Sequence, residues 1–145
     1  MIKLWAKLIK IVFTIQHNSR LEIMNDKKLW LIIAAISGFT SVAIGAFGAH
    51  GLREKLTSQM LEVYKTGVLY QLIHSLVLLA LALTTTIKGK LPSVFFLLGI
   101  ILFSFSLYIY STSGVRFWAM ITPVGGFCFL IGWLLIIYEA IKIKI

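Results

Sequence analysis

Few side chains in this sequence could carry chemistry, and those that could point to one polar cluster. Gln71 and His74 lie three residues apart in an apolar segment, so a helix places them on one face. Amide, imidazole, guanidinium and hydroxyl groups in such surroundings can bind a polar solute or pass a proton. The candidate cluster consists of His50, Arg53, Gln71, His74, Arg116 and Thr122.

These residues do not form a catalytic or metal-binding pattern. His50 and His74 are 24 residues apart, and no acidic cluster accompanies them. Cys128 is the only cysteine, which rules out an intramolecular disulfide and a cysteine-based metal site. No serine lies in a nucleophile-elbow pattern. We therefore expect no catalysis, no cofactor and no metal ion, so the protein is not expected to be an enzyme.

The composition indicates that lipid is the solvent for most of the chain. Of the 145 residues 59% are hydrophobic and 13% charged, and the mean hydropathy is +0.96. A chain of this length has too little interior to bury so much apolar surface in water. The net charge of +9 does not indicate nucleic-acid binding, because the 14 Lys and Arg residues lie almost wholly between the apolar runs.

The elements that must position the cluster are four long uncharged runs, each long enough to cross a bilayer. We predict an all-α integral membrane four-helix bundle within residues 29–140, with a cytoplasmic tail at 141–145. A short amphipathic elbow, with Ser58 as a helix N-cap, should join the first two helices. The predicted helices are about 29–49, 66–87, 92–113 and 117–139.

Residues 1–28 form a separate basic segment with two interpretations. Lys3, Lys7 and Lys10 share one side of a helical wheel, as in a helix lying on the membrane surface. Alternatively, translation begins at Met24, whose following Asn-Asp-Lys-Lys resembles an ordinary membrane-protein start. We favour the second interpretation.

Small residues predict where helices approach one another. A serine or small residue recurs every fourth position through the first run, and a proline in the fourth run should kink that helix. The packing positions are Ser41, Gly45, Gly48, Gly125 and Gly126. Aromatic residues near the membrane boundaries, including Tyr108 and Tyr138, are expected to form interfacial belts.

The positive charges predict the orientation. With both termini in the cytoplasm, ten Lys and Arg residues lie inside and four outside; a start at Met24 changes this to six against four. The candidate cluster then lies in the outer half of the membrane, with His74 close to the midplane. We expect hydrogen bonds from Gln71 and His74 to facing hydroxyl or backbone groups, with a polar path as the alternative.

The order of several motifs resembles a known family, the uncharacterised protein family 0382, also called domain of unknown function 423. Its members are small multi-pass membrane proteins found mainly in bacteria. The likeness spans about residues 24–138 and implies four helices in the plasma membrane; it implies no activity, substrate or catalytic residue. The motifs are Gly45 to Leu52 (GAFGAHGL), Tyr70-Gln71 with His74, Ser106-Leu107-Tyr108, Thr122 to Gly126 (TPVGG) and Gly132-Trp133.

The sequence thus predicts a multi-pass plasma-membrane protein with a non-catalytic structural or interaction role. Its partners would be the lipid bilayer and a second copy or another membrane protein, with no nucleic acid and no identified ligand. The alternative is a transporter or channel for a small solute or proton that uses the polar residues of the outer half.

Overall fold

The computed structural model describes the backbone of residues 2–143 and the side chains of residue 24 and residues 26–143. The side chains of the basic segment before residue 24, and with them the choice between its two interpretations, lie outside the described residues. The elements are α1 (Ile2–Gly51), α2 (Ser58–Leu83), α3 (Lys90–Gly99), the π-helical turn η1 (Ile100–Ser104), α4 (Phe105–Ser113) and α5 (Arg116–Ile141).

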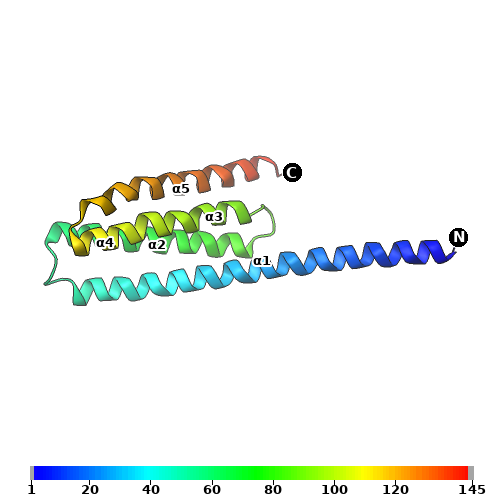
Figure 1. Cartoon of the computed structure of the whole chain (residues 1–145), viewed down its shortest axis with the longest axis horizontal. Helices are drawn as coiled ribbons and strands as arrows, with labels where there is room; N and C mark the ends of the chain where they lie inside the picture. Colours follow the sequence, from blue (N-terminus) through cyan, green and yellow to red (C-terminus); the bar gives the residue numbers. More distant parts are fainter. Residues whose placement is uncertain (1, 144–145) are drawn as a thin grey trace.

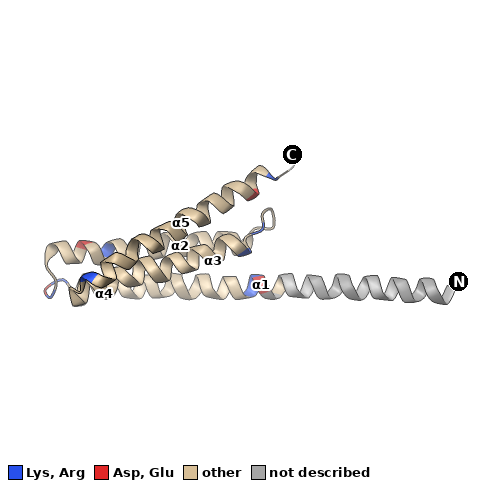
Figure 2. Cartoon of the chain, turned by 45° about the horizontal axis from the view of Figure 1, so that its top comes forward, with Lys and Arg blue, Asp and Glu red and all other residues tan. Residues whose placement is uncertain are grey.

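The predicted fold class is confirmed: all regular secondary structure of the described residues is helical, and four helices have the length and composition to span a membrane. The four segments are Asp26–Gly51, Ser58–Leu83, Lys90–Ser113 and Arg116–Ile141. Figure 2 shows that the charged residues of the described part lie at the two ends of these helices. Between the ends, large apolar side chains such as Phe39 and Phe127 are exposed, which suits contact with the acyl chains of a bilayer.

The helices form an open arrangement in which α2 and the α3–η1–α4 helix pack together in the middle. Figure 1 shows α1 and α5 on opposite sides of this pair; α1 packs on α2, and α5 packs on α3, η1 and α4. A buried apolar cluster fills the centre, with Phe96 and Leu78 fully buried. Because α1 and α5 do not close on each other, grooves remain on the flanks of the bundle.

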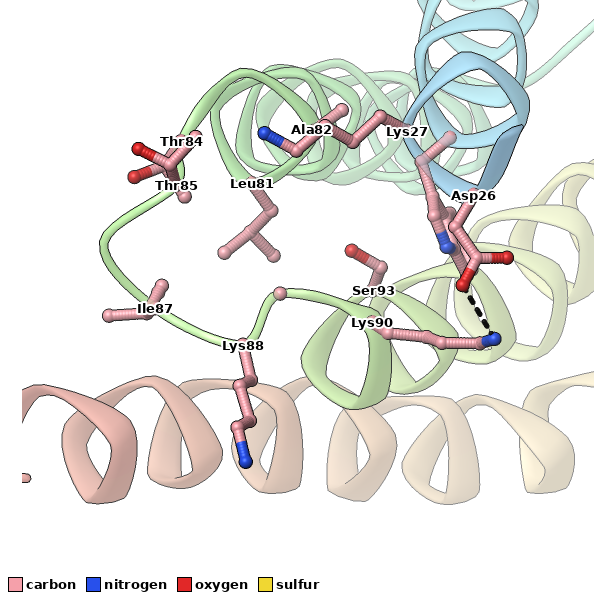
Figure 3. A pocket seen from close by; sticks show the side chains of 12 residues that line it. Asp26, Lys27, Leu81, Ala82, Thr84, Thr85, Ile87, Lys88, Lys90 and Ser93 are labelled. Atoms are coloured by element: carbon pink, nitrogen blue, oxygen red, sulfur yellow. Dashed lines mark hydrogen bonds and ion pairs between the residues drawn. The ribbon is translucent and has the colours of Figure 1, made fainter. Parts of the chain in front are cut away.

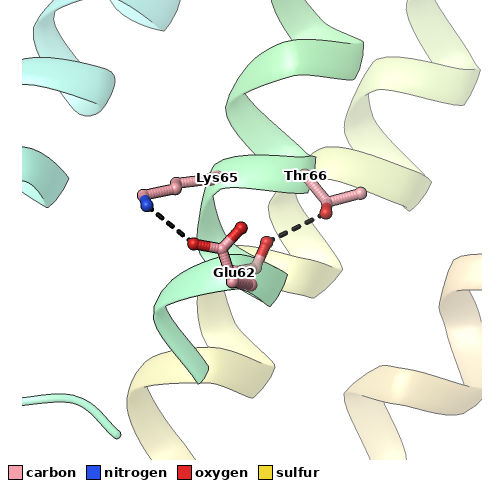
Figure 4. A network of polar contacts seen from close by, with 3 residues as sticks. All are labelled: Glu62, Lys65 and Thr66. Atoms are coloured by element: carbon pink, nitrogen blue, oxygen red, sulfur yellow. Dashed lines mark hydrogen bonds and ion pairs between the residues drawn. The ribbon is translucent and has the colours of Figure 1, made fainter. Parts of the chain in front are cut away.

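The second helix begins and ends earlier than the sequence predicts. Thr57 is its N-cap, since the threonine hydroxyl accepts a 3.2 Å hydrogen bond from the Met60 amide, and Ser58 is already helical. The charged residues Glu62 and Lys65, expected in an elbow, pair at 2.7 Å on the surface of α2 (Figure 4). The connection between the first two helices is therefore limited to residues 52–57.

The irregular helix is the third one, whereas α5 continues through Pro123. A β-carbon on Gly125 would overlap the Phe103 amide nitrogen and lie 2.7 Å from the Leu102 carbonyl carbon. The backbone of η1 thus presses directly onto α5 at this glycine, where the wider π-helical turn bulges. Gly126, by contrast, has only ordinary contacts, 3.9 Å from the Phe103 ring.

Candidate functional site

The side chain of Gln71 is the centre of a hydrogen-bonded network that joins three helices. Its Nε2 donates to the Ser37 carbonyl oxygen at 3.0 Å and to the Thr40 hydroxyl at 2.9 Å, both in α1. Its Oε1 accepts a 2.8 Å bond from the Tyr108 hydroxyl of α4. Only 1% of Gln71 is exposed. Both amide hydrogens are thereby used inside the protein, at a depth where lipid offers them no partner.

Tyr64 extends this network toward the connection between α1 and α2. Its hydroxyl donates to the Ile44 carbonyl oxygen at 3.0 Å, and its ring lies 5.1 Å from that of Tyr108. Glycines make room for both rings: a β-carbon at Gly48 would lie 2.8 Å from Tyr64 Cδ1, and one at Gly67 would lie 2.8 Å from Tyr108 Cε1. Tyr108, expected in an interfacial belt, is instead buried because it serves as the donor for Gln71.

The small-residue face of α1 is occupied by α2 of the same chain. Ser75 donates to the Gln71 carbonyl oxygen at 2.6 Å, so the 2.7 Å contact between the Ser37 and Ser75 hydroxyls is donated by Ser37. Ser41 is fully buried, and a β-carbon at Gly45 would lie 3.1 Å from Val68. The small-residue face of α1 therefore packs within the protomer and is not available to a second protein.

His74 faces α5, on the other side of α2 from the contacts of Gln71 with α1. Its ring stacks on Phe129 with centroids 3.6 Å apart and planes 7° apart. Nδ1 lies 2.8 Å from the Tyr70 carbonyl oxygen, and a carbonyl can only accept, so Nδ1 carries the hydrogen. Nε2 finds no partner within residues 26–143. It also is not among their fully enclosed unpaired atoms, which leaves it accessible from a groove.

That groove has a volume of about 550 Å³ and opens between α2 and α5. Its floor is His74, which is 5% exposed, and aromatic rings such as Phe103 and Trp133 form its walls. Its rim is apolar and faces the bilayer, with Phe127 and Leu130 more than half exposed. The groove therefore reaches lipid rather than water.

The remaining members of the predicted cluster are dispersed. Thr122 contacts Ser106 through a 2.8 Å hydroxyl–hydroxyl bond beside the π-helical turn. His50, Arg53 and Arg116 are exposed at one end of the bundle, and the described residues show no bond from them to Gln71. No group of three metal-ligating side chains occurs among the residues described. The predicted cluster is thus several separate local arrangements.

The sequence interpretation missed a cavity of about 430 Å³ at the opposite end of the bundle (Figure 3). It lies between the start of the membrane segment of α1, the end of α2, the connection that follows and the start of α3. The sequence interpretation used Lys27 and Lys90 only to predict the topology, and Asp26 only as part of the possible start at Met24. Trp30 and Ser93, which lie near the ends of apolar runs, could have indicated a binding site in the sequence. Both side chains carry a hydrogen-bond donor near the depth of the lipid headgroups.

Comparison with known proteins gives one consistent result. The model of the family "Protein of unknown function (DUF423)" matches residues 44–126. The chain is 45% identical over 121 residues to the UPF0382 inner membrane protein YgdD of Escherichia coli K12, covering 81% of this chain and 92% of that protein. It is 39% identical over 120 residues to the UPF0382 membrane protein YwdK of Bacillus subtilis, covering 79% of this chain and 98% of that protein.

No solved structure matches the chain significantly. The family match nevertheless covers the glycine-rich end of α1, Gln71, His74 and the start of α5. Together with four membrane-length helices, it fixes the class of protein. The chain belongs to the DUF423, or UPF0382, family of multi-pass membrane proteins.

Proposed function

We propose that the protein is a non-catalytic membrane component that acts by lateral association, either with a second copy or with another membrane protein. Both termini are cytoplasmic in this proposal, because that orientation places the larger number of lysines and arginines inside. The relatives are named as membrane proteins, and YgdD as an inner membrane protein, which agrees with a bacterial plasma-membrane location.

The observation that carries the proposal is the engagement of Gln71. A residue that conducts a solute must release its hydrogen bonds to that solute, whereas the amide hydrogens of Gln71 are held by Ser37 and Thr40. The Tyr108 hydroxyl donates a hydrogen bond to the side-chain oxygen of Gln71. Gln71, which is only 1% exposed, thus joins α1, α2 and α4 to one another.

Association would use the outward faces of α1 and α5. The small-residue face of α1 is already covered by α2, which leaves the opposite side, including Phe39 and Val42, exposed to the membrane. On α5, Phe127 and Leu134 are similarly exposed. The helices α1 and α5 lie on opposite sides of the central pair (Figure 1), and each could receive another helix on its exposed face.

The mass of the protein in lipid nanodiscs at low protein-to-lipid ratio tests this proposal. We expect a mass of at least two 16.3 kDa protomers, or a stoichiometric second membrane protein after purification from its native membrane. Substituting Phe39 and Val42 by polar residues should reduce that association, while the same substitution at Leu76, an exposed apolar residue of α2, should not. A monomer without a partner under both conditions would overturn the proposal.

A second candidate function, transport of a proton or small solute, is favoured by one observation. His74 Nε2 has no hydrogen-bond partner among the described residues and lies at the floor of the groove between α2 and α5. Proton entry into vesicles containing the reconstituted protein distinguishes the two functions. The association role predicts the same leakage for the wild type, for His74→Phe and for protein-free vesicles. Leakage present in the wild type and absent in His74→Phe would favour transport.

A further inference from the structure

The cavity between α1, α2 and α3 is lined by hydrogen-bond donors that the protein itself does not use. Ser93 is only 1% exposed and lines the cavity; Figure 3 shows its hydroxyl pointing into that space. Trp30, at 9% exposure, lines the same cavity. Within the described part of the chain, neither the Ser93 hydroxyl nor the indole N–H has a hydrogen-bond partner. Neither atom is among the fully enclosed unpaired atoms of the described residues.

The charges around the cavity favour an anion. Lys27, Lys88 and Lys90 line it together with a single carboxylate, that of Asp26. Asp26 already pairs with Lys90 at 2.8 Å, and the other two lysines take part in none of the ion pairs between described residues. Lys88 extends away from Ser93 in Figure 3, so it contributes to the positive field rather than to direct contact.

The position of the cavity favours a lipid over a soluble anion. It lies where three membrane segments meet the headgroup region, at Asp26, Leu83 and Lys90. Its wall includes the apolar side chains of Leu81 and Ile87, which suit the beginning of an acyl chain. Lysines that only set the topology need no hydrogen-bond donor on a buried side chain beside them, so the Ser93 hydroxyl calls for another explanation.

We propose that this cavity binds the phosphate of an anionic phospholipid. The Ser93 hydroxyl and the Trp30 N–H donate to phosphate oxygens, while Lys27 and Lys90 supply charge at the mouth. A zwitterionic phosphatidylcholine binds less well, because its choline cation is repelled by the same lysines. The inference is independent of the proposed function, since either association or transport leaves these donors equally unused.

Lipid binding can be measured by native mass spectrometry of the purified full-length protein in detergent, titrated with phosphatidylglycerol or phosphatidylcholine. We expect tighter retention of phosphatidylglycerol, and about tenfold weaker retention after Ser93→Ala or Trp30→Phe, which each remove one hydrogen bond to a charged group. Lys27→Gln, at the rim, tests the charge without altering packing. Lys65→Gln, which removes one lysine at the other end of the bundle, is the matched control and should have no effect.

The thermal stability of each variant in phosphatidylcholine shows whether the variant is folded. If Ser93→Ala or Trp30→Phe does not fold, the lipid retention of Lys27→Gln tests the proposal in its place. Equal retention of the two lipids, or equal losses in Lys65→Gln and Lys27→Gln, would overturn the proposal. A further experiment adds inorganic phosphate as a competitor of bound phosphatidylglycerol. Displacement of phosphatidylglycerol by phosphate at comparable concentration would assign the cavity to a soluble phosphate ligand and would also overturn the lipid assignment.

Discussion

The Tyr108 hydroxyl of α4 donates a 2.8 Å hydrogen bond to the Gln71 side-chain oxygen of α2, and both residues are at least nine-tenths buried. In the membrane interior no water competes for either group, so each determines where the other can lie. The same Gln71 amide binds α1 through its nitrogen. This one pair therefore couples the α1–α2 hairpin to the second half of the bundle.

Removing either partner should destabilise the fold, and removing both should cost less than the sum. Hydrogen bonds between membrane helices contribute about 0.6 kcal/mol on average. We expect Tyr108→Phe to cost roughly 1 kcal/mol and Gln71→Leu, which loses three bonds, roughly 2 kcal/mol. Unfolding in bicelles of both single variants and the double variant measures the coupling. Tyr110→Phe is the control. Additive losses would show that the pair is not coupled.

Adjacent glycines in α5 should respond very differently to a methyl group. Gly125→Ala places a β-carbon against the backbone of Leu102 and Phe103, which cannot move without shifting the π-helical turn. We expect a loss of about 1–3 kcal/mol. Gly126→Ala meets only ordinary contacts and should be neutral or stabilising by roughly 0.5 kcal/mol. Unfolding midpoints in the same detergent compare the two; similar losses would contradict the close approach of η1 to α5.

The ring of His74 should matter for stability more than its nitrogen atoms. His74→Phe retains a flat ring to stack on Phe129 and loses one bond to a carbonyl that is already part of the α2 helix. We expect it to cost less than about 1 kcal/mol, whereas His74→Ala, which opens a cavity beside Phe96 and Phe129, should cost about 2 kcal/mol or more. Equal losses in thermal unfolding would mean that the imidazole hydrogen bond, not stacking, holds this site.

The start of α2 offers a test at neighbouring positions. Thr57→Ala removes the hydroxyl that caps the Met60 amide and should destabilise the first turn by about 1 kcal/mol. Ser58→Ala, the position favoured by the sequence, should have little effect because Ser58 is already inside the helix. Hydrogen exchange at residues 60–62 reports the difference. Faster exchange in Ser58→Ala than in Thr57→Ala would place the cap at Ser58.

The sequence was sufficient to predict four helices, because lipid forces every spanning segment to be apolar and long. Gln71 and His74 could also be singled out from the sequence, because a polar side chain deep in the membrane indicates a structural or functional role. Tyr108 was not, because a tyrosine in the outer half of a helix has the same sequence signature at an interface as in a core. The π-helical turn was not predicted either; it lies against Gly125 of α5, and no local sequence pattern encodes such a contact between two helices.

The grooves and the lysine-lined cavity lie beyond sequence prediction for a related reason. They exist because α1 and α5 pack on opposite sides of the central helices and leave the flanks open. Hydropathy indicates that a face is buried but not which neighbour covers it. Ser93 and Trp30 lie on different helices, 63 residues apart, and only the packing of α1 near α3 brings both to one cavity.

We expect the polar interior around Gln71 to be dry and to hold α1, α2 and α4 together. Thr40 bonds to the Gln71 amide, so a cysteine at position 40, in a Cys128→Ser background, reports on water at that site. A small, water-soluble methanethiosulfonate reagent should label it far more slowly, from either side of the membrane, than it labels His50→Cys at the exposed end of α1. Labelling at the rate of His50→Cys would instead reveal a water-filled path through the bundle beside Gln71.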